Sequence, residues 1–325
     1  MTTPPGPTWV VGSRGLLGGA VTRALGDRGA HVLTTRVPWS DPEAAVTALD
    51  DGLGSVLDAA AGGPWNLAWC AGSGVTSTSG DALDREVATI GAFVDRALAR
   101  TPDELGQGAV FLASSAGGVY AGAAHPPFDE TTVARPLAPY GAAKLRAEAE
   151  LARLASTGGA RVLVGRISNL YGPGQDLDKA QGLISQISRA QLLVQPIGVY
   201  VSLDTVRDYL YVDDAAAMVC DGLVALRERT ATGDVVTKIL ASQRSASIAA
   251  VLGEFRRVAK RRQLVRLAAS PQASQQARDL RFRSVVWPDL DERALVPLPA
   301  GILATVTDIR MRIGAGELSA LGRRD

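Results

Sequence analysis

Short apolar runs alternate along the first half of the chain with longer segments in which apolar residues recur at helical spacing. Runs that are apolar throughout are typical of strands buried on both faces of a parallel sheet. They predict strands at Thr8–Val11, His31–Thr35, Asn66–Cys70, Gly108–Ala113 and Val162–Arg166. The segments between them predict helices at Leu16–Gly26, Pro42–Leu49, Asp84–Ala99 and about Pro139–Leu154. This alternation predicts an α/β fold with a doubly wound parallel sheet.

Beyond Gly172 the alternation becomes irregular. Helical spacing continues at Leu183–Leu193, Asp213–Arg229 and Ser247–Arg261, but strands no longer separate these segments regularly. We therefore expect a first domain at residues 1–170 and a smaller lobe at residues 171–325. The lobe is expected to be partly interwoven with the first domain, because segments of the chain can pass back into the sheet.

Composition narrows the class of protein. The chain has 325 residues, of which 46% are apolar and 21% charged, and its net charge is +1. This is ordinary globular composition and gives no hint of nucleic acid as a partner. No apolar run approaches the length needed to span a membrane, and the opening residues lack the parts of a signal peptide. With two cysteines and two histidines, we expect a cytoplasmic protein without a disulfide framework and without a metal site.

A glycine-rich turn joins the first predicted strand to the first predicted helix. It reads Gly12, Ser13, Arg14, Gly15, Leu16, Leu17, Gly18. In this context the first glycine permits a tight turn, the second lets the backbone approach a pyrophosphate, and the third lets helix and sheet pack closely. The helix N-terminus adds N–H groups and a partial positive charge. The pattern predicts a Rossmann-type dinucleotide-binding domain at residues 1–170, which leaves residues 171–325 as the substrate-binding lobe.

The end of the second strand bears on which dinucleotide binds. An NAD site usually places a carboxylate there for the ribose 2′-hydroxyl, but this chain has Thr34, Thr35 and Arg36. Arg14 lies within the glycine turn, and two guanidinium groups suit a 2′-phosphate. The sequence favours NADP over NAD. NAD stays open, because Asp41 is near enough to reverse the preference and both arginines could be ordinary surface residues.

Tyr140 and Lys144 are four residues apart on a predicted helix and therefore share a face. A neighbouring ammonium favours the ionised form of a phenol, so such a pair can exchange a proton with a substrate hydroxyl. Ser114 and Ser115 follow the strand that ends at Ala113, at the edge of the sheet where ligands bind. Either hydroxyl could bond a substrate oxygen. Tyr-Lys and Ser-Ser pairs are also common by chance, so the ordered set carries more weight than either pair.

With these motifs the chain resembles the extended short-chain dehydrogenase/reductases, specifically the NAD-dependent epimerase/dehydratase family that acts on nucleotide sugars. The resemblance covers most of the chain. Its residues are the glycine turn, Asn66–Gly72, Ser114–Tyr120, Phe128–Glu130, Pro136, Tyr140–Lys144, Arg166–Gln175 and Arg207–Asp214.

The resemblance implies roles for individual residues. Tyr140 would be the acid/base, Lys144 would favour its ionised form and bind the nicotinamide ribose, and Ser115 would orient the substrate oxygen. The serine stretch has one residue more than the common family form, so Ser114 could take that role, although we prefer Ser115. Further implied contacts are Ala71, Gly72 and Ile167 to the cofactor, and Asn169, Arg207 and Arg278 to the nucleotide-diphosphate sugar. The match at Arg278 is loose, and a surface ion pair explains that residue equally well.

The resemblance also bears on assembly. Members of the family often form a homodimer through a four-helix bundle, to which residues 82–98 and the Tyr140 helix could contribute. An apolar helix face is explained equally well by packing in the core of one chain.

Three family reactions compete. Dehydratases typically carry an Asp-Glu pair where this chain has Ala116, Gly117 and Gly118, which disfavours dehydration. A 4-epimerase and a 4-ketosugar reductase both fit. A reductase of a small carbonyl compound and a non-catalytic NADP-binding sensor or scaffold are the alternatives, although a sensor would not need the Tyr-Lys pair.

Overall fold

The computed structural model describes residues 2–72, 74, 78–177, 182–259, 264–267 and 277–317. Its centre is a six-stranded sheet in the order β10-β5-β4-β3-β1-β2, in which all neighbouring strands are parallel. The strands are β1 (Thr8–Val11), β2 (Val32–Thr34), β3 (Trp65–Trp69), β4 (Gly108–Ser115), β5 (Arg161–Ile167) and β10 (Val235–Leu240). Residues of β1, β3 and most of β4 and β5 are buried, which agrees with their continuous apolar character.

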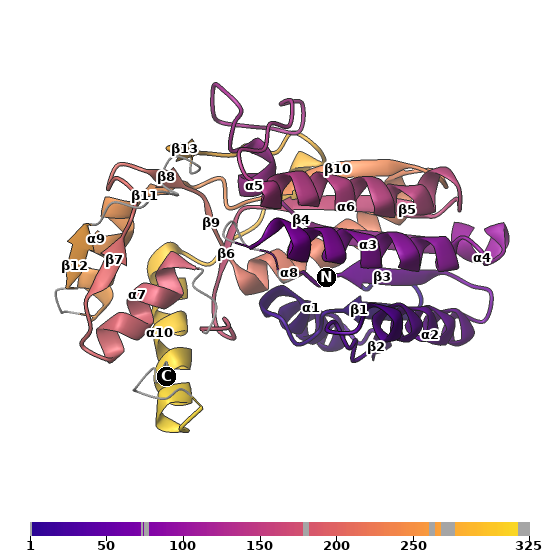
Figure 1. Ribbon diagram of the computed structural model, residues 1–325, viewed down its shortest axis with the longest axis horizontal. Helices are drawn as coiled ribbons and strands as arrows, with labels where there is room; N and C mark the ends of the chain where they lie inside the picture. The colour runs from indigo at the N-terminus through magenta and orange to yellow at the C-terminus, as the bar shows by residue number, and fades with distance from the viewer. Residues whose placement is uncertain are drawn as a thin grey trace.

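Helices cover both faces of this sheet (Figure 1). One face packs against α1 (Leu16–Asp27) and α8 (Val212–Arg229) in a single apolar cluster. The other packs against α2 (Pro42–Ala60), α3 (Gly80–Ala97) and α6 (Pro139–Ser156). Two short helices, α4 (Pro102–Gly106) and α5 (Ala116–Tyr120), flank β4. The arrangement is the doubly wound α/β fold that the sequence predicts.

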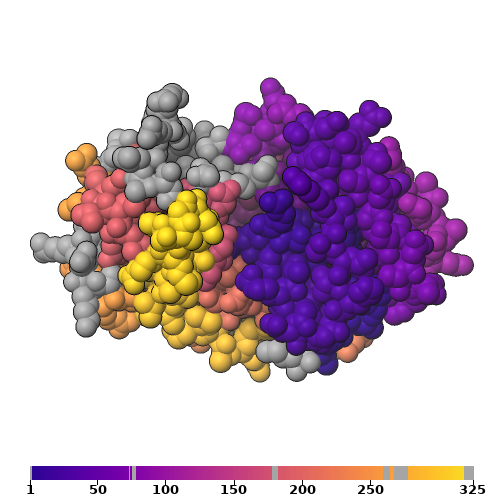
Figure 2. Space-filling view, turned by 90° about the horizontal axis from the view of Figure 1, so that it is seen from below, coloured from indigo at the N-terminus to yellow at the C-terminus, as the bar shows by residue number. Residues whose placement is uncertain are grey.

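A second lobe lies beyond the carboxyl ends of the sheet strands (Figure 1). It contains three small sheets, which pair β6 (Asn169–Tyr171) with β9 (Tyr209–Tyr211), β7 (Ile197–Val199) with β12 (Val265–Leu267), and β8 (Val206–Arg207) with β11 (Ala246–Ser247) and β13 (Asp279–Leu280). Helices α7 (Leu183–Leu192), α9 (Ile248–Ala259) and α10 (Leu298–Gly314) enclose a separate apolar core. In the view from below, the indigo and purple N-terminal part forms one half of the molecule, and α10, in yellow, lies on the other (Figure 2).

The chain crosses between the two lobes more than once. After β9 it returns through α8 and β10, and β10 becomes the outermost sheet strand beside β5. The 3-10 helix η2 (Pro288–Asp291) later packs against α8. The two lobes therefore exchange segments of the chain, and a domain boundary near residue 170 stays a proposal.

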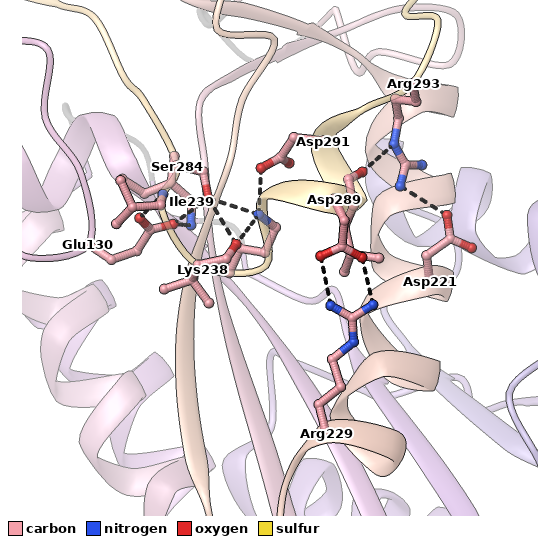
Figure 3. Close-up of polar contacts among 12 residues, drawn as sticks. Glu130, Asp221, Arg229, Lys238, Ile239, Ser284, Asp289, Asp291 and Arg293 are labelled. Atoms are coloured by element: carbon pink, nitrogen blue, oxygen red, sulfur yellow. Dashed lines mark hydrogen bonds and ion pairs between the residues drawn. The ribbon is translucent and has the colours of Figure 1, made fainter.

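Buried polar contacts join β10 to residues 284–291, which follow β13 in the chain (Figure 3). Lys238, only 1% exposed, donates from Nζ to Ser284 Oγ at 2.8 Å, to the Val286 carbonyl at 2.6 Å and to Asp291 Oδ2 at 2.8 Å. Glu130 accepts from the Ile239 N–H at 2.7 Å and from Ser284 Oγ at 2.6 Å. We call this group the β10 clasp. A buried ammonium is tolerated here because all three of its donors have acceptors.

Most element boundaries match the sequence predictions closely, with one larger difference at α2. The apolar pattern predicts a helix that ends at Leu49, but α2 extends to Ala60. Two glycines and three acids between Leu49 and Ala60 weaken the apparent pattern. Leu53 and Val56 nevertheless continue the buried stripe, and Gly52 packs directly under the Trp9 ring, where a side chain would not fit. Tertiary packing therefore overrides the local signal.

Among the described residues, no helix combines the length and apolar character needed to cross a membrane.

Candidate active site

A cleft of about 2100 Å³ opens at the carboxyl ends of β1, β3, β4 and β5, between the sheet and the second lobe. This is the edge of an open α/β sheet where ligands bind. Residues from both halves of the chain line it, from the glycine turn at one end to Arg207 and Tyr209 in the second lobe. The cleft brings together nearly all of the site residues that the sequence predicts.

The glycine turn has the close packing that its spacing predicts. Gly12 has a positive φ of +84°, and a Cβ on it would lie 2.7 Å from the Ala71 nitrogen. At Gly18 a Cβ would run into the Gly12 carbonyl. Gly15 is the N-cap of α1, and no side chain caps this end of the helix. The backbone therefore forms a narrow cradle whose N–H groups suit an anion such as a pyrophosphate.

Next to this cradle, the cleft is lined by cationic and aromatic side chains. Arg14 and Arg36 are exposed and line the cleft. Trp39 lines it too, and its ring packs edge-on against the ring of Trp69, with 6.4 Å between the ring centroids. Asp41 is committed elsewhere, because its carboxylate caps α2 by accepting from the N–H groups of residues 43 and 44, each at 3.1 Å. The acid that could have bound a ribose 2′-hydroxyl is therefore a helix cap.

Ser115, Tyr140 and Lys144 lie together on one wall of the cleft. The Tyr140 ring packs against Gly118, where a Cβ would lie 2.9 Å from Tyr140 Cε1 and 3.3 Å from Ser115 Oγ. Lys144 Nζ is 5.8 Å from the centroid of the Tyr140 ring. The absence of a side chain at Gly118 thus lets the serine and the phenol share one small space.

The two serines have different environments. Ser114 is 6% exposed, and its hydroxyl donates to Glu148 Oε1 at 2.5 Å. Ser115 is half-buried, faces the cleft and accepts from the Gly118 N–H at 3.1 Å, which caps α5. Its hydroxyl hydrogen is not used by that bond. This geometry favours Ser115 over Ser114 as the substrate contact.

Behind Ser114 lies a buried ionic network that the sequence reasoning missed. Glu148 accepts two hydrogen bonds from Arg166, from Nε at 3.1 Å and from Nη2 at 2.7 Å. Arg166 also donates to the Tyr120 hydroxyl at 2.6 Å. Burial raises the pKa of the Tyr120 phenol, so it stays protonated at neutral pH. The network joins β4, α5, α6 and β5 directly beneath the serines.

Arg207, on β8, contributes a cation to the cleft from the second lobe. It is half-buried, lines the cleft and donates to the carbonyl of its neighbour Val206 at 2.8 Å. Burial lowers the pKa of its guanidinium, although the nearby Tyr209 and Asp279 act in the opposite direction. Among the described residues, no carboxylate forms an ion pair with it. A cation that is desolvated in this way favours an anionic ligand.

The remaining predicted contacts divide into two groups. Ala71, Gly72, Ile167 and Asn169 line the cleft, and the Asn169 amide donates to the Asp208 carbonyl at 2.9 Å. Arg278 does not line the cleft. Its side chain is 77% exposed and forms a surface ion pair with Asp204, so we leave it out of the proposed site.

Within the part of the chain that the structure describes, no group of histidines, cysteines and acids has the arrangement of a metal site. Cys70 lines the cleft, but burial raises the pKa of its thiol far above neutrality, so it is a poor nucleophile.

Comparison with known proteins agrees with this geometry. Residues 8–236 match the family described as "NAD dependent epimerase/dehydratase family". A segment of 105 residues is 35% identical to dTDP-4-dehydro-6-deoxyglucose reductase of Escherichia coli, and 107 residues are 33% identical to a putative UDP-glucose 4-epimerase of Methanocaldococcus jannaschii. These matches span about a third of this chain, and 33% and 35% of the two relatives.

Solved structures share the whole fold at low identity. MoeE5 in complex with UDP-glucose and NAD has a TM-score of 0.78 and 21% identity, with coverage of 95% of this chain and 100% of the other. The RMD protein of Pseudomonas aeruginosa, complexed with NADPH, has a TM-score of 0.73 and 20% identity, with coverage of 96% and 100%. At this level of identity the likeness establishes the fold.

Proposed function

The chain belongs to the NAD dependent epimerase/dehydratase family, and we propose that it transfers hydride at a carbon of a nucleotide-diphosphate sugar, as a 4-epimerase or a 4-ketosugar reductase. It is an enzyme of the extended short-chain dehydrogenase/reductase type, which uses a nicotinamide cofactor. The observation that carries the proposal is that Ser115, Tyr140 and Lys144 line the same cleft as the glycine cradle and Arg207.

The side chains on the cleft wall have complementary tasks in this proposal. The nicotinamide ring, when bound, supplies or accepts the hydride. Tyr140 exchanges the accompanying proton with the sugar hydroxyl or ketone, while Ser115 donates a hydrogen bond to the same oxygen. Lys144 favours the phenolate by its charge.

We propose NADP(H) as the cofactor. Support comes from Arg14 and Arg36, which line the end of the cleft expected to hold the adenosine ribose, and from Asp41, which caps α2 instead. A doubly charged 2′-phosphate between two guanidinium groups is a favourable arrangement. The solved relatives bind either NAD or NADPH according to their descriptions, so this choice rests on the side chains of this chain.

We propose that Arg207 binds the diphosphate of the sugar nucleotide. Its support is the half-buried guanidinium without a carboxylate partner among the described residues. Gly117 also lines the cleft, and a Cβ there would meet only Leu280 Cδ1, at 3.7 Å, so this position leaves room for the sugar. A sugar that turns within the site, as an epimerase needs, and a ketosugar that is reduced in place are both compatible with this space.

Tyr140→Phe tests the proposal, because it keeps the ring and removes the proton carrier. Turnover of the accepted nucleotide sugar is expected to fall by about 10²–10⁴-fold, while cofactor affinity is retained. Tyr200→Phe is a matched control, since Tyr200 also lines the cleft but belongs to the second lobe. Equal rates for Tyr140→Phe and the parent enzyme would refute the assigned role of Tyr140.

Two measurements separate the alternatives. Mass spectrometry of the protein as purified identifies any retained dinucleotide and its 2′-phosphate, and a tightly held oxidised cofactor favours an epimerase. Titration of Arg207→Ala with UDP tests the diphosphate site. If the variant binds UDP as well as the parent, the substrate is better sought among small carbonyl compounds. If NADPH binds but no nucleotide sugar in a broad panel reacts, the proposed substrate class is wrong.

A further inference from the structure

A carboxylate from the neighbouring helix holds Lys144. Glu86, on α3, places Oε1 at 3.3 Å from Lys144 Nζ, across the contact between α3 and α6. The two side chains are 11% and 20% exposed, for Lys144 and Glu86 respectively, and both residues line the cleft. The pair is therefore part of the active-site wall.

We propose that Glu86 is a positioning residue that fixes the Lys144 ammonium beside Tyr140 and offsets part of its charge, so that it sets the pH at which Tyr140 can act as a base. This inference rests on the proposed function of Tyr140. In this proposal Glu86 changes how strongly Lys144 favours the Tyr140 phenolate, although Glu86 itself does not touch the substrate oxygen.

The backbone beneath the pair is shaped to admit it. A Cβ on Gly72 would lie 2.9 Å from Lys144 Nζ and 3.1 Å from Glu86 Oε1. Both charged groups therefore rest directly over the end of β3, in space that any other residue at position 72 would narrow. Because this same segment lines the cleft, the pair is held at the place where the cofactor must approach.

The surroundings make Glu86 the principal counter-charge. The charged groups that line this part of the cleft are Lys144 from α6 and Arg85 and Glu86 from α3. Gly118 and Ser115, which pack against Tyr140, carry no charge. Glu148, one turn after Lys144 on α6, is paired with Arg166 at 2.7 Å. Arg85 is exposed, so solvent screens it more strongly than the half-buried Glu86. Removing the Glu86 charge therefore leaves the Lys144 charge less compensated, and the phenolate of Tyr140 becomes more favourable.

Glu86→Gln tests this in the holoenzyme, because it keeps the shape and removes the charge. In the direction that oxidises the sugar, the acid limb of the kcat profile is expected to move to lower pH by roughly half to one unit. Glu86→Asp keeps the charge and is expected to restore most of the parent profile. Asp84→Asn is the matched control, since Asp84 on the same helix also pairs with an α6 cation, Arg146, at 2.6 Å, but its side chain is 61% exposed.

A second readout separates this inference from the proposed function. Ionisation of Tyr140 can be followed by ultraviolet difference absorbance against Tyr140→Phe, without turnover. The expected result is ionisation at lower pH in Glu86→Gln and no change in Asp84→Asn. An unchanged or higher midpoint in Glu86→Gln overturns the inference, even if kcat falls. If the midpoint shifts while Tyr140→Phe keeps full turnover, Glu86 does adjust Tyr140, but the proposed function is wrong.

Discussion

Replacing Glu148 with Gln should destabilise the fold strongly, because Glu148 is the carboxylate of the buried network under the serines. It accepts hydrogen bonds from Ser114 and from two nitrogens of Arg166. The side chains of Arg166 and Glu148 are 12% and 10% exposed, so solvent can replace little of what is lost. Glutamine keeps one acceptor, but Arg166 is left buried without a counter-charge.

The size of the effect follows from this burial. Removing one partner of a buried ion pair typically costs about 3–5 kcal/mol. Arg166 keeps the hydrogen bond to the Tyr120 hydroxyl and lies 5.2 Å from the centroid of its ring, which places the expected loss at the lower end, about 3 kcal/mol. The free energy of unfolding is measured by urea denaturation with linear extrapolation.

Two further variants make this measurement decisive. Glu150→Gln, on the same helix, removes a more exposed pair with Arg153, whose side chains are 41% and 32% exposed for Arg153 and Glu150, and is expected to cost less than about 1 kcal/mol. The double variant Glu148→Leu with Arg166→Met should recover most of the loss, because no unpaired charge remains buried. If Glu148→Gln costs no more than Glu150→Gln, the network is solvated and the reasoning from burial is wrong.

Three other changes test the site and its surroundings. Gly118→Ala places a Cβ 2.9 Å from Tyr140 Cε1, so kcat should fall about tenfold to a hundredfold with little change in NADPH affinity; unaltered kcat would show that the ring is free to move. Arg36→Ser should weaken NADPH by about tenfold or more relative to NADH in fluorescence titrations, and equal weakening would contradict the 2′-phosphate contact. Burial raises the pKa of Asp208, so the folded state binds this proton more tightly than the unfolded chain does. Stability relative to Asp208→Asn should therefore fall as pH rises above the ordinary aspartate value of about 3.9; urea unfolding at several pH values checks the sign.

The parts of the site that could be predicted from the sequence depend on local geometry. The glycine turn places its residues within one strand-to-helix connection, and Tyr140 and Lys144 are one helical turn apart, so spacing alone implies their proximity. For Asp41 the sequence leaves open a contact with the ribose, although an acid followed by Pro42 is also a typical helix start. Its place as the cap of α2 follows from that pattern.

The missed residues depend on contacts between distant segments. Glu86 is 58 positions from Lys144, and Glu148 is 34 positions from Ser114 and 18 from Arg166. Each lies within a helix, and in the sequence neither can be distinguished from the charged residues on a solvent-exposed helix face. Their partners are determined by how α3, α6 and the strands pack, which no spacing within one element specifies. Arg278 shows the converse, because a residue that fits a loose motif lies on the surface.

The position of β10 at the edge of the sheet has a consequence for biosynthesis. During synthesis on the ribosome, β5 is complete long before β10 has been made. The N–H and C=O groups of β5 that later pair with β10 therefore face either water or another nascent chain. A fragment that ends near residue 170 would keep β5 as an unpaired edge strand and should aggregate. Co-expression of the missing C-terminal half would supply β10 and the β10 clasp in trans. Recovery of soluble protein in that experiment would show that pairing of β10 with β5 prevents the aggregation.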